Sequence, residues 1–216
     1  KYLQGYERDF IQTTKLCKMI TDQQIKMIFL SSGGTVYGNQ EIQPITEDAL
    51  PRPINHYGNV KLCIENTIRT FNYQAHTKIL IARISNPYGP GQDFNKGVGF
   101  IDAAIKKTIR SEKIEIWGDG NNVRDYIYID DVCRMLISLF YYQEDYDTFN
   151  ISSNTGTSQR DVIRMLEAMQ LAPQVEYLPA RSVDAKKIIL NNERIMSIHA
   201  VPLVPVEQGI RKYYQW

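Results

Sequence analysis

The residues Met27-Ile28-Phe29-Leu30 form a short apolar run that leads directly into Ser31-Ser32-Gly33-Gly34-Thr35-Val36-Tyr37-Gly38. A continuous apolar run that ends in small, turn-forming residues is typical of a buried strand in a parallel sheet. A second such run, Ile79 to Ile84, is followed by Asn86-Pro87-Tyr88-Gly89-Pro90-Gly91, and the segment 60–71 between the runs has apolar residues at helical spacing. Strand, helix and strand in this order predict a parallel α/β sheet, and ligands of such sheets bind beyond the carboxyl ends of the strands.

The predicted helix begins with Tyr57-Gly58-Asn59-Val60-Lys61, which places a tyrosine and a lysine four residues apart. Residues at this spacing lie on one face of a helix, one turn from each other. An ammonium near a phenol favours the phenolate, so Tyr57 is a candidate general base and we expect its pKa to be depressed. The pattern alone is weak, because tyrosine and lysine are also common on solvated helix faces.

The remaining segments predict further helices and strands. An amphipathic helix is expected over about 7–21, a loop over 39–56, and a strand near 124–129 that runs into a helix N-cap. Thr157 or Ser158 is expected to cap another helix. The other expected elements are helices with apolar faces at Phe100–Ile109, Val132–Phe140, 162–169 and from Val206, and short strands at Ile114–Trp117, Phe149–Ile151 and Val175–Tyr177.

Composition excludes several classes of protein. The 216 residues are 43% hydrophobic and 23% charged with a net charge of +1, so we expect neither nucleic acid nor an anionic membrane as a partner. No apolar run approaches the ~20 residues of a membrane span. Cys17, Cys63 and Cys133 fit neither a disulfide framework nor a zinc site, and the three histidines are isolated. We therefore expect free thiols, no metal site, and a reducing, cytoplasmic compartment.

The glycine spacing excludes one common motif. No two of the 13 glycines lie three residues apart, so the G-x-G-x-x-G turn that cradles a dinucleotide phosphate is absent from this sequence.

Five motifs occur together in a fixed order. They are Ser31-Ser-Gly-Gly-Thr-Val-Tyr-Gly38, Tyr57-x-x-x-Lys61, Arg83-Ile-Ser-Asn-Pro-Tyr-Gly-Pro-Gly91, Trp117-Gly-Asp-Gly120 and Arg124-Asp-Tyr-Ile-Tyr-Ile-Asp-Asp131. This series resembles the extended short-chain dehydrogenase/reductases, in particular the NAD-dependent nucleotide-sugar epimerases and dehydratases such as UDP-glucose 4-epimerase. The resemblance implies an α/β fold: the C-terminal part of a Rossmann-type parallel sheet, plus a smaller α/β substrate-binding domain.

The resemblance also implies a domain division and a cofactor. Residues 1–87 would be the C-terminal part of the NAD-binding domain and 88–216 the nucleotide-sugar-binding domain, with segments near 125–152 returning to the Rossmann sheet. The family carries its glycine-rich turn in a preceding half, so we expect the gene product to be longer than this chain. Without that half the sequence does not distinguish NAD from NADP, and NAD is the family's usual cofactor.

The resemblance assigns roles to the residues at the strand ends. Tyr57 would take the proton from a sugar hydroxyl while NAD accepts the hydride from the same carbon, and Lys61 would bind the nicotinamide ribose. Ser85 and Pro87 would border the nicotinamide. In an epimerase the 4-keto sugar then turns in the pocket, and the hydride returns to the opposite face.

Position 33 departs from the family pattern. The family's catalytic Ser or Thr aligns with Gly33, which has no hydroxyl, so Ser32 or Thr35 would have to supply one. Sugar 4,6-dehydratases place an acidic pair at the positions of Gly34 and Thr35, and neither acid is present here. Among the reactions of the family, this leaves epimerisation or simple redox chemistry at one carbon.

Several further residues match the family's substrate contacts. Asn86 would meet the diphosphate, or else be an ordinary turn asparagine, and Trp117 would pack beside the base, or else belong to the core. Arg124 would grip phosphate, or else form a surface salt bridge. The other matches are Gly97 and Val98 for backbone contacts to the base, Arg181 for phosphate, and Asp184 for ribose.

Three functional hypotheses follow. The first is a nucleotide-sugar 4-epimerase acting on a UDP-hexose or a UDP-N-acetylhexosamine. The second is a reductase or dehydrogenase of the same fold with net turnover of cofactor, and the third is a relative that binds a nucleotide sugar without catalysis. Dimerisation through the helices at 7–21 and 60–71 is common in the family, so we expect a homodimer.

Overall fold

The computed structural model describes residues 2–92, 99–180 and 186–216. The chain begins with continuous helix, divided into α1 (Tyr2–Gln4), a π-helical segment (Gly5–Phe10) and α2 (Ile11–Asp22). The helix expected over 7–21 is therefore confirmed and begins earlier than expected. A π-helical turn in a helix is uncommon and is often found at functional sites.

A three-stranded parallel sheet is the centre of the fold. Its strands β1 (Ile28–Ser32), β2 (Leu80–Ile84) and β6 (Thr148–Ile151) lie in the order β1-β2-β6. The register pairs Ser32, at the end of β1, with Ile84, at the end of β2, so their carboxyl ends lie at one edge. The predicted parallel α/β sheet is confirmed.

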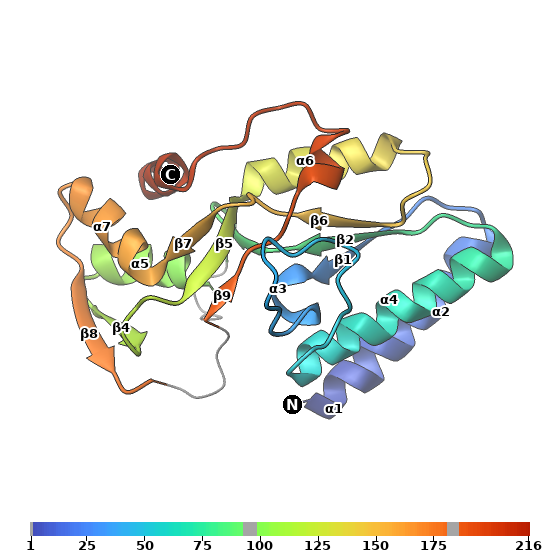
Figure 1. Cartoon of the computed structure of the whole chain (residues 1–216), viewed down its shortest axis with the longest axis horizontal. Helices are drawn as coiled ribbons and strands as arrows, with labels where there is room; N and C mark the ends of the chain where they lie inside the picture. The colour runs from blue at the N-terminus through green and yellow to red at the C-terminus, as the bar shows by residue number, and fades with distance from the viewer. Residues whose placement is uncertain (1, 93–98, 181–185) are drawn as a thin grey trace.

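Helices cover both faces of this sheet (Figure 1). On one face, α2 and α4 (His56–Ala75) pack on the strands through a cluster that includes Cys17, Val60, Ile64 and Ile68. On the other face, α6 (Ile129–Tyr141) packs through Val132, Met135 and Leu139. β2, the central strand, is buried along almost its whole length, which agrees with its mostly apolar residues.

The described strands after β2, apart from β6, form two further sheets, one of four strands and one of two. β3 (Asn86–Tyr88) pairs with β5 (Val123–Tyr128), which also pairs with β7 (Gly156–Ser158) and β9 (Lys187–Ile188). β4 (Lys113–Trp117) pairs in parallel with β8 (Gln174–Leu178). Around them pack α5 (Phe100–Ile109), α7 (Gln159–Ala168) and α9 (Val206–Gln215), while α3 (Gly33–Val36) and α8 (Glu193–Met196) are single turns elsewhere in the fold.

The helix ends agree only partly with the sequence predictions. Of the two residues expected to cap α7, Ser158 is the N-cap, and it forms a capping box with Asp161. Thr157 precedes the cap and lies in β7. The N-cap of α6 is Tyr128, with no side-chain bond, and Asp130 and Asp131 lie in the first turn instead. There the two carboxylates still face the positive end of the helix dipole.

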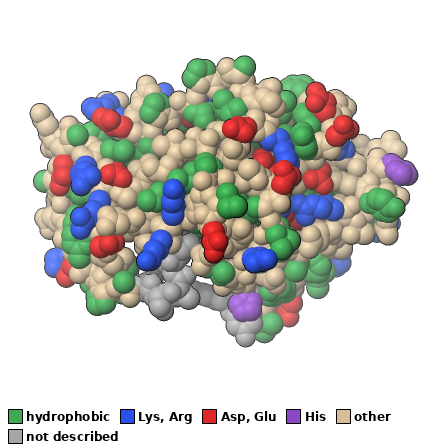
Figure 2. Space-filling model, in the orientation of Figure 1, with side chains coloured by type: hydrophobic (Ala, Val, Ile, Leu, Met, Phe, Trp, Pro, Cys, Tyr) green, Lys and Arg blue, Asp and Glu red, His purple; other side chains and the backbone are tan. Residues whose placement is uncertain are grey.

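The face of the molecule drawn in Figure 2 carries charges of both signs without a large single-sign region. Lys and Arg side chains are interspersed with Asp and Glu over the face in Figure 2. Cys17, Cys63 and Cys133 are all free thiols. Within the described ranges, no helix combines the length and the hydropathy needed to cross a membrane.

Candidate active site

The first turn of α4 is placed by its cap and by a glycine. The Asn55 side chain accepts a hydrogen bond from the Gly58 amide at 2.8 Å, which satisfies one of the free N–H groups of the helix start. A Cβ on Gly58 would lie 2.6 Å from the Thr35 carbonyl oxygen. Glycine is therefore required for α4 to begin directly against α3, and this contact brings Tyr57 to the end of β1.

Tyr57 and Lys61 do not form a directly coupled pair in this structure. The Lys61 ammonium donates to the Leu30 carbonyl at 3.0 Å and lies 5.7 Å from the centre of the Tyr57 ring. Partial desolvation raises the pKa of Tyr57, Ser32 lowers it and Asp9 raises it, so the net direction is upward. Burial lowers the pKa of Lys61, which Asp9 and Glu65 partly offset. The expected depression of the Tyr57 pKa is therefore wrong, because desolvation raises this pKa and the Lys61 ammonium binds the Leu30 carbonyl instead of the phenol.

The hydroxyl groups after β1 have different surroundings. Ser32 is the last residue of β1 and the N-cap of α3, where its side chain makes no capping bond. Ser32 lowers the pKa of the Tyr57 phenol, against the larger effect of desolvation. The Thr35 hydroxyl donates to the Ser32 carbonyl oxygen at 3.4 Å, a local bond within the turn. Gly33 is buried.

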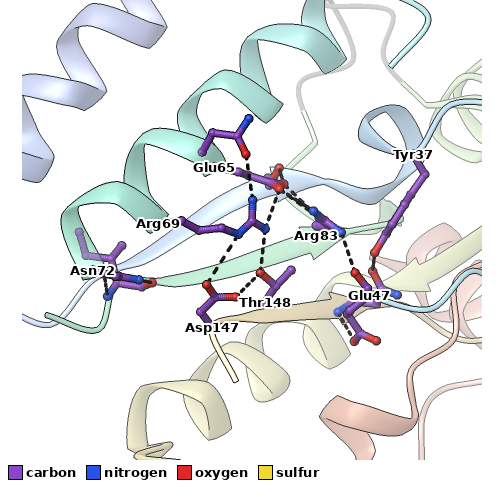
Figure 3. Close-up of polar contacts among 12 residues, drawn as sticks. Tyr37, Glu47, Glu65, Arg69, Asn72, Arg83, Asp147 and Thr148 are labelled. Atoms are coloured by element: carbon purple, nitrogen blue, oxygen red, sulfur yellow. Dashed lines mark hydrogen bonds and ion pairs between the residues drawn. The ribbon is translucent and has the colours of Figure 1, made fainter. Parts of the chain in front are cut away.

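A buried ion pair holds α4 to the sheet (Figure 3). Glu65, two turns after Tyr57, is fully buried and accepts from Arg83 of β2 at 2.6 Å. The same carboxylate accepts from the Ser31 hydroxyl at 2.6 Å and from Arg69 at 3.3 Å. Charge-assisted bonds of this kind fix both geometry and register. The ion pair thereby fixes the height of α4 along β1 and β2.

The same arginine extends the polar network beneath the strand ends. The Arg83 guanidinium lies 4.7 Å from the centre of the Tyr37 ring, and the Tyr37 hydroxyl donates to Asn150 at 2.7 Å. Burial raises the pKa of Tyr37 to about 12, so this phenol remains a neutral donor. The Glu47 carboxylate accepts from the Asn150 amide at 2.8 Å, as Figure 3 shows in part. Tyr37 is therefore a structural residue of this network.

A cavity of about 300 Å³ lies beside the strand ends. Asn86, Pro87, Trp117 and Arg124 all line it, so the structure brings together four residues that the sequence assigned to the cofactor or the substrate. The additional lining residues, which the sequence analysis missed, include Tyr88, Asp102, Asn122, Tyr126 and Gln159. Asn122 and Gln159 carry no motif signal, since only the fold brings them to the cavity wall.

Asp125 organises the strand ends next to this cavity. Its buried carboxylate accepts from the hydroxyl of Ser85 at 3.3 Å, from both the amide and the hydroxyl of Ser153, and from the amides of Asn154 and Leu190. Burial raises its pKa to about 6 against the opposing effect of these donors. The hydroxyl of Ser85 thus faces the protein interior, and the Asn86 amide is held by the Asp125 carbonyl at 3.0 Å.

The two parts of the site meet at Gly34. A Cβ on Gly34 would lie 3.9 Å from the side-chain oxygen of Asn86, so this position faces a residue of the cavity wall. A second cavity, of about 570 Å³, is lined by Tyr57 and Lys61 themselves, together with Arg8, Asp9 and His56 among others. Gly97, Val98, Arg181 and Asp184 lie outside the described residues.

These features place the chain in the class of Rossmann-type α/β proteins with a Tyr-Lys pair beside the carboxyl end of a parallel strand. The chain belongs to the NAD dependent epimerase/dehydratase family, whose sequence profile matches residues 3–152.

Known relatives within the family differ in activity. The chain is 27% identical to a putative UDP-glucose 4-epimerase of Methanocaldococcus jannaschii, over 94% of this chain and 67% of that protein. It is 33% identical to a dTDP-4-dehydro-6-deoxyglucose reductase of Escherichia coli, over 87% of this chain and 60% of that protein. The chain therefore spans between three fifths and about two thirds of the length of these two relatives.

Solved structures share the fold over the whole chain. A UDP-glucose 4-epimerase of Thermotoga maritima with UDP-glucose superposes with a TM-score of 0.93 at 28% identity, covering 100% of this chain and 71% of that one. A UDP-glucose 4-epimerase of Thermus thermophilus with NAD gives a TM-score of 0.88 at 25% identity, covering 97% and 70%. The Rossmann-type fold expected from the sequence is confirmed.

Proposed function

We propose that the gene product containing this chain is an NAD-dependent nucleotide-sugar 4-epimerase that acts on a UDP-hexose or a UDP-N-acetylhexosamine. The observation that carries the proposal is the environment of Gly34. This position lies beside Asn86, which lines the cavity, and neither Gly34 nor Thr35 carries a carboxylate. Elimination of water from a sugar needs an acid and a base beside the neighbouring carbons. The residues at the end of β1 and the start of α4 offer a phenol and small hydroxyls, which suit redox chemistry at a single carbon.

The substrate would lie in the cavity of about 300 Å³. Arg124 on its wall suits the phosphates, because a planar guanidinium can donate two parallel bonds to phosphate oxygens. Trp117 offers an aromatic face to the base, and Asn86 an amide at the diphosphate end. Gly97, Val98, Arg181 and Asp184 remain part of the proposal as further contacts to the nucleotide.

The residues present fit the nicotinamide-ribose end of NAD. The Lys61 ammonium has three donors, of which the Leu30 carbonyl takes one, and ribose hydroxyls suit the others. Pro87, exposed after the end of β2, offers an apolar edge beside the ring, and Ser85 contributes backbone there. When bound, NAD supplies the acceptor for the hydride that leaves the sugar carbon and the donor that returns it.

Tyr57 would carry the proton in both directions. As the C4–H bond breaks, the phenolate oxygen takes the proton of the C4 hydroxyl and leaves a ketone. In the return step the phenol gives this proton back to the C4 oxygen, after the opposite face of the ketone has been presented.

The test is proton NMR of UDP-galactose and UDP-N-acetylgalactosamine, each incubated with the intact gene product and NAD. We expect a new anomeric signal from the C4 epimer without net formation of NADH, and its absence in the Tyr57→Phe variant. Unchanged spectra for both sugars would refute a UDP-sugar 4-epimerase. Binding of UDP-sugars without turnover would then favour a protein that only binds.

A reductase of 4-keto nucleotide sugars is the second candidate. The observation in its favour is the 33% identity to the Escherichia coli dTDP-4-dehydro-6-deoxyglucose reductase. The same residues would serve, with Tyr57 as the acid that protonates the C4 oxygen. Stoichiometric loss of NADH or NADPH absorbance with dTDP-4-dehydro-6-deoxyglucose would establish it, and an epimerase would show no net loss.

We also propose a homodimer in the cytoplasm. Ile11, Leu16 and Met19 remain exposed on α2, beside the face that packs on the sheet. Multi-angle light scattering of the intact gene product should give twice the monomer mass, and a monomer mass at micromolar concentration would refute the dimer.

A further inference from the structure

Gln159 lies on the wall of the cavity of about 300 Å³, which Trp117 and Arg124 also line. It is the first residue of α7 and is half-buried. Its side-chain oxygen Oε1 is buried and has no hydrogen-bond partner among the residues that the structure describes. A buried acceptor without a partner is destabilising, so such an atom on a cavity wall marks a place where a ligand can supply a donor.

The start of α7 is tied to the turn that follows Trp117. Arg160, the residue after Gln159, donates from Nε to the Asp119 carbonyl at 2.6 Å. Its backbone amide donates to the Gly120 carbonyl at 3.2 Å. In addition, the capping box holds the first turn of the helix. The backbone at Gln159 is therefore fixed beside the turn, and the fold determines that this side chain lies on the same cavity as the indole.

Asp102 is another group on the cavity wall whose oxygens have no hydrogen-bond partner within the described part of the chain. It is only 2% exposed, and a Cβ on Gly99 would lie 2.3 Å from its Oδ2, so the carboxyl group lies directly against the backbone at the start of α5. Burial raises the pKa of Asp102, which Tyr213 partly offsets. Asp102 is thus enclosed by protein, whereas the half-buried Gln159 keeps part of its surface accessible.

The amide of Gln159 has the hydrogen-bonding pattern of a group that reads the edge of a base. A side-chain amide places an acceptor beside a donor. The imide edge of uracil or thymine places a ring N–H beside a carbonyl, so the two edges can form a pair of parallel hydrogen bonds. Cytosine has an acceptor in place of this ring N–H and cannot donate from its ring to Oε1. Trp117, on the wall of the same cavity, offers an aromatic face on which a planar base can stack.

We propose that Gln159 selects the nucleobase of the substrate, and that this base is uracil or thymine. Oε1 accepts a hydrogen bond from the ring N3–H, and Nε2 donates to the neighbouring ring carbonyl. The inference rests on the proposed function, because that function assigns this cavity to the nucleotide. It adds a side chain that discriminates between bases, which no motif in the sequence indicates.

Calorimetry of the intact gene product tests the contact without turnover. The ligands are UDP and 3-methyluridine 5′-diphosphate, in which a methyl group replaces the N3 hydrogen. The wild type should bind the methylated ligand at least about tenfold more weakly, because one hydrogen bond is lost and Oε1 stays unpaired. Gln159→Ala removes the amide and leaves room for the methyl group, so it should bind both ligands equally. Glu167→Ala, exposed on the same helix, should behave as the wild type does.

A second variant tests selection between bases. Gln159→Glu removes the Nε2 donor and leaves a carboxylate, which accepts from the exocyclic amine of cytosine but repels a uracil carbonyl. The ratio of CDP affinity to UDP affinity should therefore rise at least about tenfold. An unchanged ratio would overturn the proposal. An equal loss for the methylated ligand in the wild type and Gln159→Ala, or no binding of UDP by the wild type, would overturn it as well.

The outcomes for base selection and for the epimerase are separable. If the NMR assay shows no C4 epimer while the wild type and Gln159→Ala differ as expected in calorimetry, the epimerase is refuted and base selection by Gln159 stands. If the C4 epimer forms and the two proteins do not differ, base selection by Gln159 is refuted and the epimerase stands.

Discussion

The ion pair between Glu65 and Arg83 makes the sharpest prediction about stability. Both side chains are almost completely buried, and their closest atoms are 2.6 Å apart. Glu65→Gln keeps the shape of the side chain and its bond to Ser31 but removes the charge that faces Arg83. Arg83 cannot relieve this by losing a proton, because a guanidinium stays protonated in proteins. The variant therefore leaves a buried, uncompensated cation.

The loss in the free energy of unfolding depends on which charges remain buried in each variant. Removal of one partner from a buried pair costs about 3–5 kcal/mol, so we expect a loss in this range for Glu65→Gln. Arg83→Met leaves Glu65 with Arg69 at 3.3 Å and with the Ser31 hydroxyl, so its cost should lie near the lower end, about 3 kcal/mol. The double variant removes both charges, and it should cost less than either single change.

Urea unfolding of the intact gene product, followed by circular dichroism, measures these differences. The matched control is the exposed pair Lys18–Asp22, 2.8 Å apart on α2, where Lys18→Met should cost less than about 1 kcal/mol. If the two single costs simply add in the double variant, the charges do not interact and the reasoning is refuted. A loss for Glu65→Gln no larger than that of the control would refute it as well.

Four further changes test other parts of the site and fold. Asp9→Asn should lower the pKa of Tyr57, because Asp9 raises it, and the rise of kcat/KM with pH should move to lower pH in a pH–rate profile. The pKa of Asp125 is about 6 in the folded protein and about 4 in the unfolded chain, so the free energy of unfolding should fall by roughly 3 kcal/mol as the pH rises from 4 to 6. Urea unfolding across this range measures the fall, and Asp125→Asn should abolish this pH dependence. Ser158→Ala should cost about 1 kcal/mol in thermal unfolding, because the capping box of α7 is lost. Arg124→Lys should weaken the binding of UDP roughly tenfold, measured by calorimetry, because lysine cannot donate two parallel hydrogen bonds to a phosphate. An unchanged affinity would show that Arg124 does not bind the phosphates.

The elements that the sequence predicts well are those that bury a whole face. β2 is mostly apolar because helices cover both of its faces, and α4 repeats its apolar residues because one face packs on the sheet. β7 and β9 were not predicted. They have three and two residues, and they form only because β5 offers partners brought close by the fold. Local pattern carries no signal for such pairings.

The candidate site could be predicted as a set of residues but not as an arrangement. Asn86, Trp117 and Arg124 do meet at one cavity, whereas Gln159 joins them without any motif. The five donors of Asp125 come from segments far apart in sequence, so no spacing predicts that this carboxylate is the buried one. The contact between Leu190 and Gly33 likewise joins residues far apart in the sequence, so no local pattern predicts it.

The Tyr-Lys motif therefore predicts that Tyr57 and Lys61 lie near each other, but it does not predict the pKa of the tyrosine. Lys61 lies four residues after Tyr57 and therefore one helical turn from it. The Lys61 ammonium nevertheless donates its hydrogen bond to the Leu30 carbonyl, and desolvation raises the pKa of the Tyr57 phenol. The groups that then decide the ionisation lie elsewhere in the sequence: Ser32 at the end of β1, and Asp9 in the π-helical segment. These two neighbours shift the ionisation of Tyr57 in opposite directions, since Ser32 lowers its pKa and Asp9 raises it. Substitutions at Ser32 and Asp9 should therefore move the pH dependence of the proposed reaction in opposite directions without touching the motif.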